Sequence, residues 1–294
     1  MAVDTQTKCY IVTDLDNTLV GNSTATQEFN RKILAWRDQV GLIYATGRSY
    51  GSAKQLQRSE NLLEPHYWIT GVGSEIYHQG DRDRTWSDHL NHQWHREAIL
   101  ALTTDVPELI PQPKDSQNEF KISFYLYDSK ASEILANLRH RIRKAGFDVQ
   151  VIYSSQEDLD ILPIRCDKGL AMRHVMNRLG LSNEMTIVCG DSGNDIGLFK
   201  QNTLGVIVNN AQRELLDWHR NQSIHQSSDR ISDQNSGLNS DQNSHQNIRQ
   251  SSDQNSDRIH KQIYDRIHYS ENAYAAGILE GVARLKPELF SMSV

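Results

Sequence analysis

The chain has 294 residues, and its 31 Lys and Arg against 37 Asp and Glu leave a formal net charge of −6. This mildly acidic chain lacks the basic face that nucleic acid binding requires, so we expect no nucleic-acid partner. No apolar run approaches the roughly 18–20 residues of a membrane span, no signal peptide is evident, and three scattered cysteines form no disulfide framework. We therefore expect a cytoplasmic monomer without a membrane partner.

The first third of the chain alternates short apolar runs with helical patterns. Strands are predicted at 10–13, 41–45 and 67–70, and helices at 26–39 and 49–60. Such alternation is typical of βαβ units, in which helices cover both faces of a parallel sheet.

The pattern changes after residue 80. Residues 81–118 are polar and show no clear parallel strand. After them we expect an amphipathic helix at 130–145 and strands at 121–127, 149–153 and 159–162. We interpret residues 81–163 as an inserted α+β cap domain, and residues 1–80 and 164–294 as a doubly wound α/β core domain.

The βα rhythm returns after Pro163, with helices predicted at 168–179, 194–201 and 272–285 and strands at 186–189 and 205–208. Residues 221–268 interrupt it, because Ser, Asp, Asn and Gln dominate there and Ala, Val, Phe, Met and Pro are absent. Such a segment cannot bury enough apolar surface to offset an ordering entropy of about 1–2 kcal/mol per residue. We interpret it as a disordered insertion; a prion-like interaction tract is the alternative.

Two acidic residues, Asp14 and Asp16, directly follow the first predicted strand. Side chains at i and i+2 of extended backbone point the same way, here into the crevice at the carboxyl end of a parallel sheet. Two close carboxylates repel each other and need a cation or a shared proton. The alternative is a surface turn rich in Asp and Asn.

A second motif, Thr46-Gly47-Arg48-Ser49, directly follows the second predicted strand. A hydroxyl, a flexible glycine and a guanidinium at a strand end suit phosphate oxygens. An ordinary turn with Ser49 as the N-cap of the next helix is the other interpretation.

Two further motifs belong to the second half of the core. Lys168 begins a predicted helix, at the unfavourable end of the helix dipole, which hints at an accompanying anion. Asp191, Asn194 and Asp195 lie on a glycine-flanked loop after a predicted strand and offer the oxygen ligands that Mg²⁺ prefers. Because the strand ends of a doubly wound sheet face one crevice, the four motifs together predict a site for phosphate and Mg²⁺.

The order of these motifs resembles the haloacid dehalogenase (HAD) superfamily of phosphohydrolases. Residues 44–50, 73–77 and 121–123 extend the likeness to sucrose-phosphate phosphatases, particularly the cyanobacterial form, over 8–220 and 268–286. The resemblance implies that Asp14 is a nucleophile forming an aspartyl-phosphate, and that Asp16 is the general acid and base.

The resemblance also implies the remaining ligands. Mg²⁺ would be held by Asp14, the backbone carbonyl of Asp16, and Asp191, with Asp195 in support. Phosphoryl oxygens would be held by Thr46, Gly47, Lys168 and Asn194. The cap would select the sugar, with substrate contacts expected from Arg48, Glu75, Lys121, Ser123, Asp158 and Asp160.

For Lys121, Ser123, Asp158 and Asp160 of the cap, a role as ordinary surface residues is an equally good interpretation. Trp86 and Trp94 could stack on a sugar ring, but core packing is the favoured interpretation. His92 and His95 are expected at the surface rather than on a metal, because no acidic or Cys partner follows at ligand spacing.

The expected reaction is therefore the hydrolysis of sucrose 6F-phosphate to sucrose and inorganic phosphate, the final step of sucrose synthesis, with sucrose-phosphate synthase as a candidate partner. One alternative is another capped HAD enzyme, such as a trehalose- or mannosylglycerate-type phosphatase or a phosphomannomutase. A second is a non-catalytic subunit that binds a phosphosugar or a synthase.

Overall fold

The computed structural model describes residues 9–222 and 266–291. The insertion predicted at 221–268 falls almost entirely outside these residues. Its two ends are described and are regular: a helix covers residues 213–222, and strand β12 (Ile267–Tyr269) begins immediately after the gap. The predicted range therefore overlaps a helix at its first residues and a strand at its last. No helix of the described chain is long and apolar enough to cross a membrane.

The large domain is built on an eight-stranded, mostly parallel sheet with the order β12-β11-β10-β1-β2-β3-β4-β5. Strand β1 lies in the middle of the sheet and pairs in parallel with both β10 and β2. The seven strands other than β12 are β1 (Cys9–Thr13), β2 (Val40–Ala45), β3 (Tyr67–Thr70), β4 (Glu75–His78), β5 (Asp81–Arg82), β10 (Thr186–Gly190) and β11 (Leu204–Ile207).

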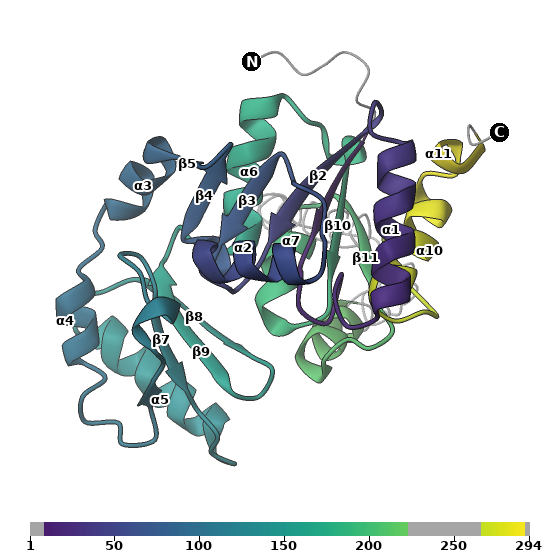
Figure 1. Cartoon of the computed structure of the whole chain (residues 1–294). Coiled ribbons are helices and arrows are strands. Elements are labelled where there is room, and N and C mark those ends of the chain that lie inside the picture. Colours follow the sequence, from purple (N-terminus) through teal and green to yellow (C-terminus); the bar gives the residue numbers. More distant parts are fainter. Residues whose placement is uncertain (1–8, 223–265, 292–294) are drawn as a thin grey trace, which may run out of the picture.

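Helices cover both faces of this sheet (Figure 1). In β1, Cys9 and Ile11 join one apolar core and Tyr10 and Val12 the other, as the alternation of side chains along a strand requires. The first core is closed by α1 (Ser23–Ala35), α2 (Tyr50–Ser59), α10 (Tyr274–Leu285) and α11 (Glu288–Ser291), and the second by α6 (Lys168–Leu179), α7 (Ile196–Phe199) and helix 213–222.

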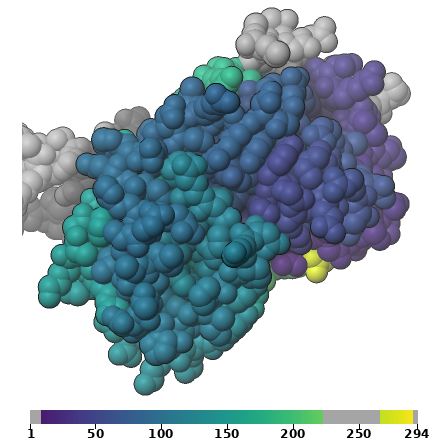
Figure 2. Space-filling view, turned by 60° about the vertical axis from the view of Figure 1, so that its left-hand side comes forward, coloured from purple at the N-terminus to yellow at the C-terminus, as the bar shows by residue number. Residues whose placement is uncertain are grey.

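The small domain is a separate antiparallel sheet of order β6-β7-β9-β8. Figure 2 shows this domain, in blue and teal, lying against the large one. Its strands are β6 (Ile110–Pro111), β7 (Ile122–Tyr125), β8 (Val149–Ser154) and β9 (Asp158–Pro163), and its helices include α4 (Arg96–Ala101) and α5 (Ala131–Lys144).

The two faces of the small sheet differ in polarity. Ile122 and Phe124 of β7 and Leu159 and Ile161 of β9 belong to a core shared with α5. Residues at the alternate positions, Lys121, Tyr125, Asp158 and Asp160, line a cavity between the domains. Period-two patterning thus turns one face of the cap sheet toward its own helix and the other toward the large domain.

The predicted start of the cap at residue 81 differs from the structure. Strand β5 pairs with β4 of the large sheet, and α3 (Arg84–Asn91) is tied to the same domain. In α3 the Trp86 Nε1–H donates to the carbonyl of Gly73 at 2.8 Å. A two-residue antiparallel strand is too short for any periodicity, which is why the sequence pattern missed it.

Candidate active site

The loop after β1 places Asp14 and Asp16 at the carboxyl edge of the sheet. The Asp14 N–H donates to the carbonyl of Cys189 in β10, the residue that pairs with Thr13 of β1. The loop after β1 therefore starts beside the acidic loop that follows β10. Leu15 is fully buried between the two acids. The Thr18 hydroxyl donates to Asp191 Oδ1 at 2.7 Å and joins the two acidic loops.

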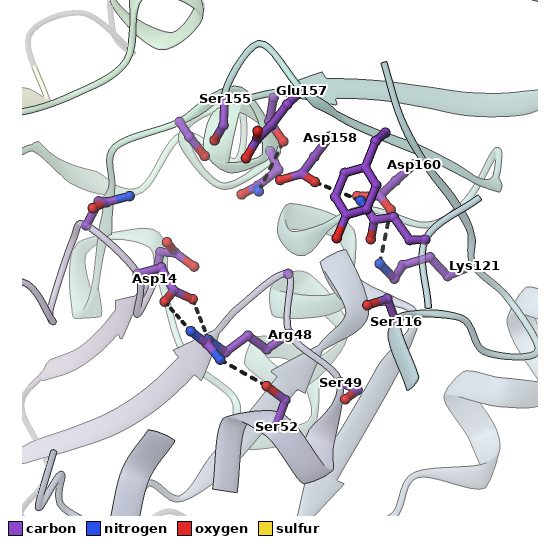
Figure 3. Close-up of a pocket in the computed structure, with 18 of the residues that line it drawn as sticks. Asp14, Arg48, Ser49, Ser52, Ser116, Lys121, Ser155, Glu157, Asp158 and Asp160 are labelled. Atoms are coloured by element: carbon purple, nitrogen blue, oxygen red, sulfur yellow. Dashed lines mark hydrogen bonds and ion pairs between the residues drawn. The ribbon is translucent and has the colours of Figure 1, made fainter. Parts of the chain in front are cut away.

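Asp16 is held by Arg48, which follows β2. The Nε and Nη2 of Arg48 donate to the two carboxylate oxygens of Asp16, each at 2.7 Å. Its Nη1 donates to Ser52 Oγ at 2.9 Å (Figure 3). The hydrogen bonds to Asp16 raise the pKa of Arg48. The guanidinium occupies both carboxylate oxygens of Asp16, so Asp16 has to leave Arg48 before it can contact a bound ligand.

Lys168 is fully buried beneath the first acidic loop. Its Nζ donates to Asp14 Oδ1 at 2.8 Å and to Asp195 Oδ1 at 2.7 Å. Burial alone lowers the pKa of Lys168, but the charges of Asp14 and Asp195 outweigh it and raise that pKa, so the ammonium stays charged. The anion that the sequence hinted at beside this helix start is a pair of carboxylates.

Three buried acids, Asp14, Asp191 and Asp195, place carboxylate oxygens within 4.8 Å of one another. Burial, followed by the neighbouring acids, raises the pKa of Asp14 well above its usual range and that of Asp191 to about 7. Such crowding is relieved by a cation, and an all-oxygen donor set suits a hard divalent ion. The residues present therefore fit the metal site typical of HAD proteins.

The three acids are not equally free to bind a metal. Asp195 Oδ2 accepts the N–H groups of Asp191 and Ser192, each at 3.0 Å, and its Oδ1 accepts Lys168. Asp195 therefore shapes the loop and holds Lys168, while Asp14 and Asp191 line the open cavity. The side chain of Asp16, occupied by Arg48, lies outside the three-acid cluster.

The residues expected to hold phosphate fall into two groups. Gly47 and Asn194 line the cavity, and the Oδ1 atom of Asn194 is buried without a hydrogen-bond partner among the described residues. Thr46 and Lys168 are buried behind lining residues, and the Thr46 hydroxyl accepts the N–H of Arg48 at 3.1 Å. Ser49 is the N-cap of α2, but its side chain makes no capping hydrogen bond.

The cavity has a volume of about 690 Å³ and is walled by both domains (Figure 3). The cap residues predicted to contact the sugar that line this cavity are Lys121, Asp158 and Asp160. Ser123 does not line it; the Ser123 hydroxyl instead donates to Asp160 Oδ1 at 2.5 Å, beside the buried Lys121–Asp160 ion pair of 3.0 Å. Ser123 therefore acts on the cavity through Asp160.

Asp158 faces the cavity from the first position of β9. Its carboxylate accepts Gln112 Nε2 at 2.7 Å. Burial, followed by the charges of Asp160 and Glu157, raises the pKa of Asp158 to about 6. This carboxyl is therefore partly protonated near pH 6 and can donate as well as accept a hydrogen bond.

Glu75, expected to contact the substrate, is not among the residues that line this cavity. It lies at the start of β4, where its carboxylate accepts the Thr70 hydroxyl at 3.4 Å and lies 3.9 Å from Arg82. The antiparallel turn from β3 into β4 pairs Glu75 with Thr70 and so directs its charge within the large domain.

Sequence reasoning missed much of the cavity wall. The turn between β8 and β9 contributes Ser154, Ser155 and Glu157, and its Ser-Ser-Gln-Glu composition was an available signal for a polar turn. Asn17 and Ser192 also line the cavity and lie within the two acidic motifs, although neither was assigned a role. The other lining residues belong to no motif: Ser52, Gln112, Asp115, Ser116, Tyr125 and Gln212.

The two tryptophans lie in the core and the two histidines at the surface, as the sequence analysis favoured. Trp86 and Trp94 are buried, and the Nε1–H of Trp94 donates to the carbonyl of Glu119 at 2.8 Å, so both serve packing. His92 and His95 are exposed and belong to no cluster of potential metal ligands in the described chain.

Comparison with known proteins identifies the lineage of this site. The family model of sucrose-6F-phosphate phosphohydrolases matches residues 7–236. The chain belongs to this family. Sucrose-phosphatase 2 of Nicotiana tabacum is 39% identical over 220 residues, which make up 71% of this chain and 52% of the tobacco protein. The chain thus spans about half the length of the curated relatives it matches.

Solved structures agree with this family in fold. The X-ray structure of the sucrose-phosphatase from Synechocystis sp. PCC6803, in complex with sucrose and phosphate, is similar with a TM-score of 0.77 and 35% identity, covering 95% of this chain and 98% of that one. A haloacid dehalogenase-like hydrolase protein from Bacillus subtilis, yhjK, is 15% identical with a TM-score of 0.58, covering 97% and 93% of the two chains. The latter likeness shows the fold alone, and together they confirm the predicted HAD-type architecture.

Proposed function

We propose that this chain is a Mg²⁺-dependent phosphatase that hydrolyses sucrose 6F-phosphate to sucrose and inorganic phosphate. The observation that carries the proposal is the Asp14–Lys168–Asp195 arrangement at the floor of a polar cavity, in a member of the sucrose-6F-phosphate phosphohydrolase family. A buried carboxylate that a fixed ammonium orients is prepared to attack phosphorus as a nucleophile.

In the first half of the reaction, Asp14 attacks the phosphorus and the bond from phosphorus to the sugar oxygen breaks. Asp16, once released from Arg48 and protonated, gives its proton to the departing sugar alkoxide. In the second half, Asp16 takes a proton from water as that water attacks the aspartyl-phosphate, and Asp14 is freed as a carboxylate. Lys168 keeps Asp14 in place throughout and offsets the negative charge that develops on the transferring group.

A bound Mg²⁺ would be held by Asp14 and Asp191, and it would reduce the repulsion between the anionic nucleophile and the anionic phosphate. Asp195 supports this arrangement by fixing the N–H groups of Asp191 and Ser192. Thr46, Gly47 and Asn194 remain the proposed neighbours of the phosphoryl oxygens.

The polar face of the cap sheet supports a sugar as the leaving group. Lys121, Asp158 and Asp160 turn toward the acidic loops across the cavity, and Arg48 faces them from the large domain (Figure 3). Charged donors and acceptors on a common wall suit the hydroxyls of a polyol. We propose that the cap domain recognises the sugar. We also propose that the enzyme is a cytoplasmic monomer and that it receives its substrate from a sucrose-phosphate synthase.

Phosphate release from a panel of sugar phosphates, with and without Mg²⁺, tests the proposal. Sucrose 6F-phosphate is expected to be the best substrate by kcat/KM, and EDTA should abolish turnover. Preference for a trehalose or mannosylglycerate phosphate would reassign the sugar, and transfer of phosphate between sugar positions without its release would indicate a mutase. Tight binding of the phosphosugar without any turnover would identify a non-catalytic subunit.

A further inference from the structure

The turn between β8 and β9 is attached to the large domain by a hydrogen bond. The N–H of Ser155 donates to Glu214 Oε1 at 2.5 Å. Ser155 lies at the tip of the cap hairpin and lines the cavity, whereas Glu214 lies in helix 213–222 of the large domain. The carboxylate therefore bridges the two domains at the mouth of the site.

The backbone around this contact is shaped for it. Ser155 and Gln156 have φ values of 55° and 58°, which direct the turn away from an ordinary strand continuation. A charged acceptor on a backbone N–H makes a stronger bond than a neutral one. Glu214 can thus hold a turn whose own conformation is strained.

Gly193 on the acidic loop after β10 provides the room for this approach. A Cβ added at Gly193 would lie 2.8 Å from Glu214 Cγ and 2.8 Å from the carbonyl oxygen of Tyr153 in β8. The neighbouring Asn194 Nδ2 lies 3.5 Å from Ser154 Oγ. The cap hairpin, the acidic loop and Glu214 therefore meet at one closely packed point.

We propose that Glu214 is a positioning residue that holds the β8–β9 turn against the acidic loop, so that Glu157 and Asp158 face the sugar of the substrate. This inference rests on the proposed function, and it makes Glu214 a residue on which the affinity for the sugar phosphate depends. Glu214 acts through the turn and touches none of the reacting atoms. Its removal should therefore weaken recognition of the sugar and spare the chemistry at phosphorus.

Kinetics with two substrates separate these effects. Glu214→Ala should raise KM for sucrose 6F-phosphate about tenfold or more, the loss expected for a hydrogen bond to a charged group. The kcat/KM for p-nitrophenyl phosphate, which has no sugar for the cap to read, should stay within about twofold. Glu214→Gln keeps an acceptor oxygen and should recover most of the affinity. Asp217→Ala is the matched control, since it removes an acid of the same helix whose ion pairs among the described residues are with Arg213 and Arg220.

Hydrogen exchange of the Ser155 amide provides a readout that needs no turnover. Exchange should accelerate in Glu214→Ala and in Gly193→Ala, whose Cβ displaces the turn, but not in Asp217→Ala. If wild-type protein fails to hydrolyse sucrose 6F-phosphate, the proposed function is wrong. Hydrogen exchange at Ser155 still tests the Ser155–Glu214 hydrogen bond in that case. Unchanged exchange at Ser155, or equal losses on both substrates in Glu214→Ala, would overturn the role of Glu214.

Discussion

At the scale of single residues, the two acids after β1 are distinguished by their partners. Asp14 is buried against an ammonium that holds one of its oxygens, whereas Asp16 is partly exposed and bound by a partly exposed guanidinium that lines the cavity. Two carboxylates separated by one residue can serve different roles when their surroundings differ in this way. The proposed division into nucleophile and proton carrier follows from that difference.

Replacing Asp14 by Asn tests the nucleophile. The amide retains the size of the side chain but cannot form the acyl phosphate, so kcat should fall at least about a thousandfold. Because Lys168 keeps Asp195 as a partner, the melting temperature should change little. The same change at the exposed Asp38 is the control and should leave phosphate release intact. Turnover near the wild-type rate in Asp14→Asn would exclude the covalent route.

Replacing Lys168 by Met tests the buried cation. Asp14 and Asp195 would then lack their shared partner, and an uncompensated buried charge costs about 3–5 kcal/mol. The free energy of unfolding in urea should fall by that order in metal-free buffer, and added Mg²⁺ should restore part of it because the acids gain a cation. Lys130→Met, at an exposed position, should leave the unfolding curve unchanged. A Lys168→Met curve that matches wild type would show that the acids are not crowded.

The raised pKa of Asp158, about 6, predicts a pH effect on stability. Its folded-state pKa lies above the usual value near 3.9, so the folded protein favours the protonated form. The resulting stabilisation is present below about pH 4 and is lost as the pH rises through about 6. Asp158→Asn should therefore melt at a higher temperature than wild type at pH 7.5 and at a similar one at pH 4. The exposed Asp148→Asn should show no such dependence; parallel profiles for wild type and Asp158→Asn would contradict the shift.

At the scale of elements, the loop after β11 connects the end of the chain to the first acidic loop. Asn210 Nδ2 donates to the carbonyl of Asn17 at 2.6 Å, and Asn210 Oδ1 accepts the N–H of Tyr274 at the start of α10. Asn17 has a φ of 58°, a left-handed conformation that needs support in a non-glycine residue. Helix α10, near the C-terminal end of the sequence, therefore helps to shape a loop near its N-terminal end.

Asn210→Ala tests this connection. Loss of the contact should loosen the loop that carries Asp16, so kcat should fall about tenfold, with a smaller change in KM. Asn209→Ala is a close control, because the Asn209 amide donates to the carbonyl of Glu271 in the same C-terminal segment, and its hydrogen bonds in the described chain do not reach the Asn17 loop. Equal rates in the two variants would show that Asn210 merely anchors α10.

At the scale of the whole molecule, two bodies enclose the site and a low-complexity segment interrupts the larger one. Strand β12 resumes immediately after this segment and pairs with β11, and α10 then packs on α1 and β11. The elements on both sides are thus held by contacts of their own. The acidic loops, and all the described residues that line the cavity, lie outside this segment.

Deletion of residues 223–265, joined by a Gly/Ser linker of about ten residues, should preserve kcat, KM and melting temperature. A doubling of loop length costs only about 0.6 kcal/mol, so removing the segment should stabilise slightly if it changes anything. Limited proteolysis of the full chain should cut this segment first and leave two fragments that elute together. A tenfold loss of kcat/KM on the sugar phosphate, about 1.4 kcal/mol, would assign the segment to the active enzyme.

The sequence by itself determined the α/β class and brought the candidate site residues to one edge of the sheet. Buried parallel strands leave continuous apolar runs, and the residues directly after such runs must lie at the carboxyl edge of the sheet. A strand directly precedes each of the loops that carry Asp14, Arg48 and Asp191. These residues meet because their strands are parallel neighbours, and the pattern of strands was visible in the sequence. The roles assigned to these residues remain predictions for the experiments above.

Only the tertiary structure decided which side chains are partners. The bonds from Arg48 to Asp16, from Lys168 to Asp195 and from Ser155 to Glu214 join positions 27 to 59 residues apart. Glu75 illustrates the converse, since its motif-like setting gave no sign that an antiparallel turn would pair it with Thr70, outside the set of residues that line the cavity. Local sequence sets the backbone preference and the polarity of each segment. Which side chains become hydrogen-bond or ion-pair partners depends on how whole elements pack, and the periodicity of a short window carries no information about that packing.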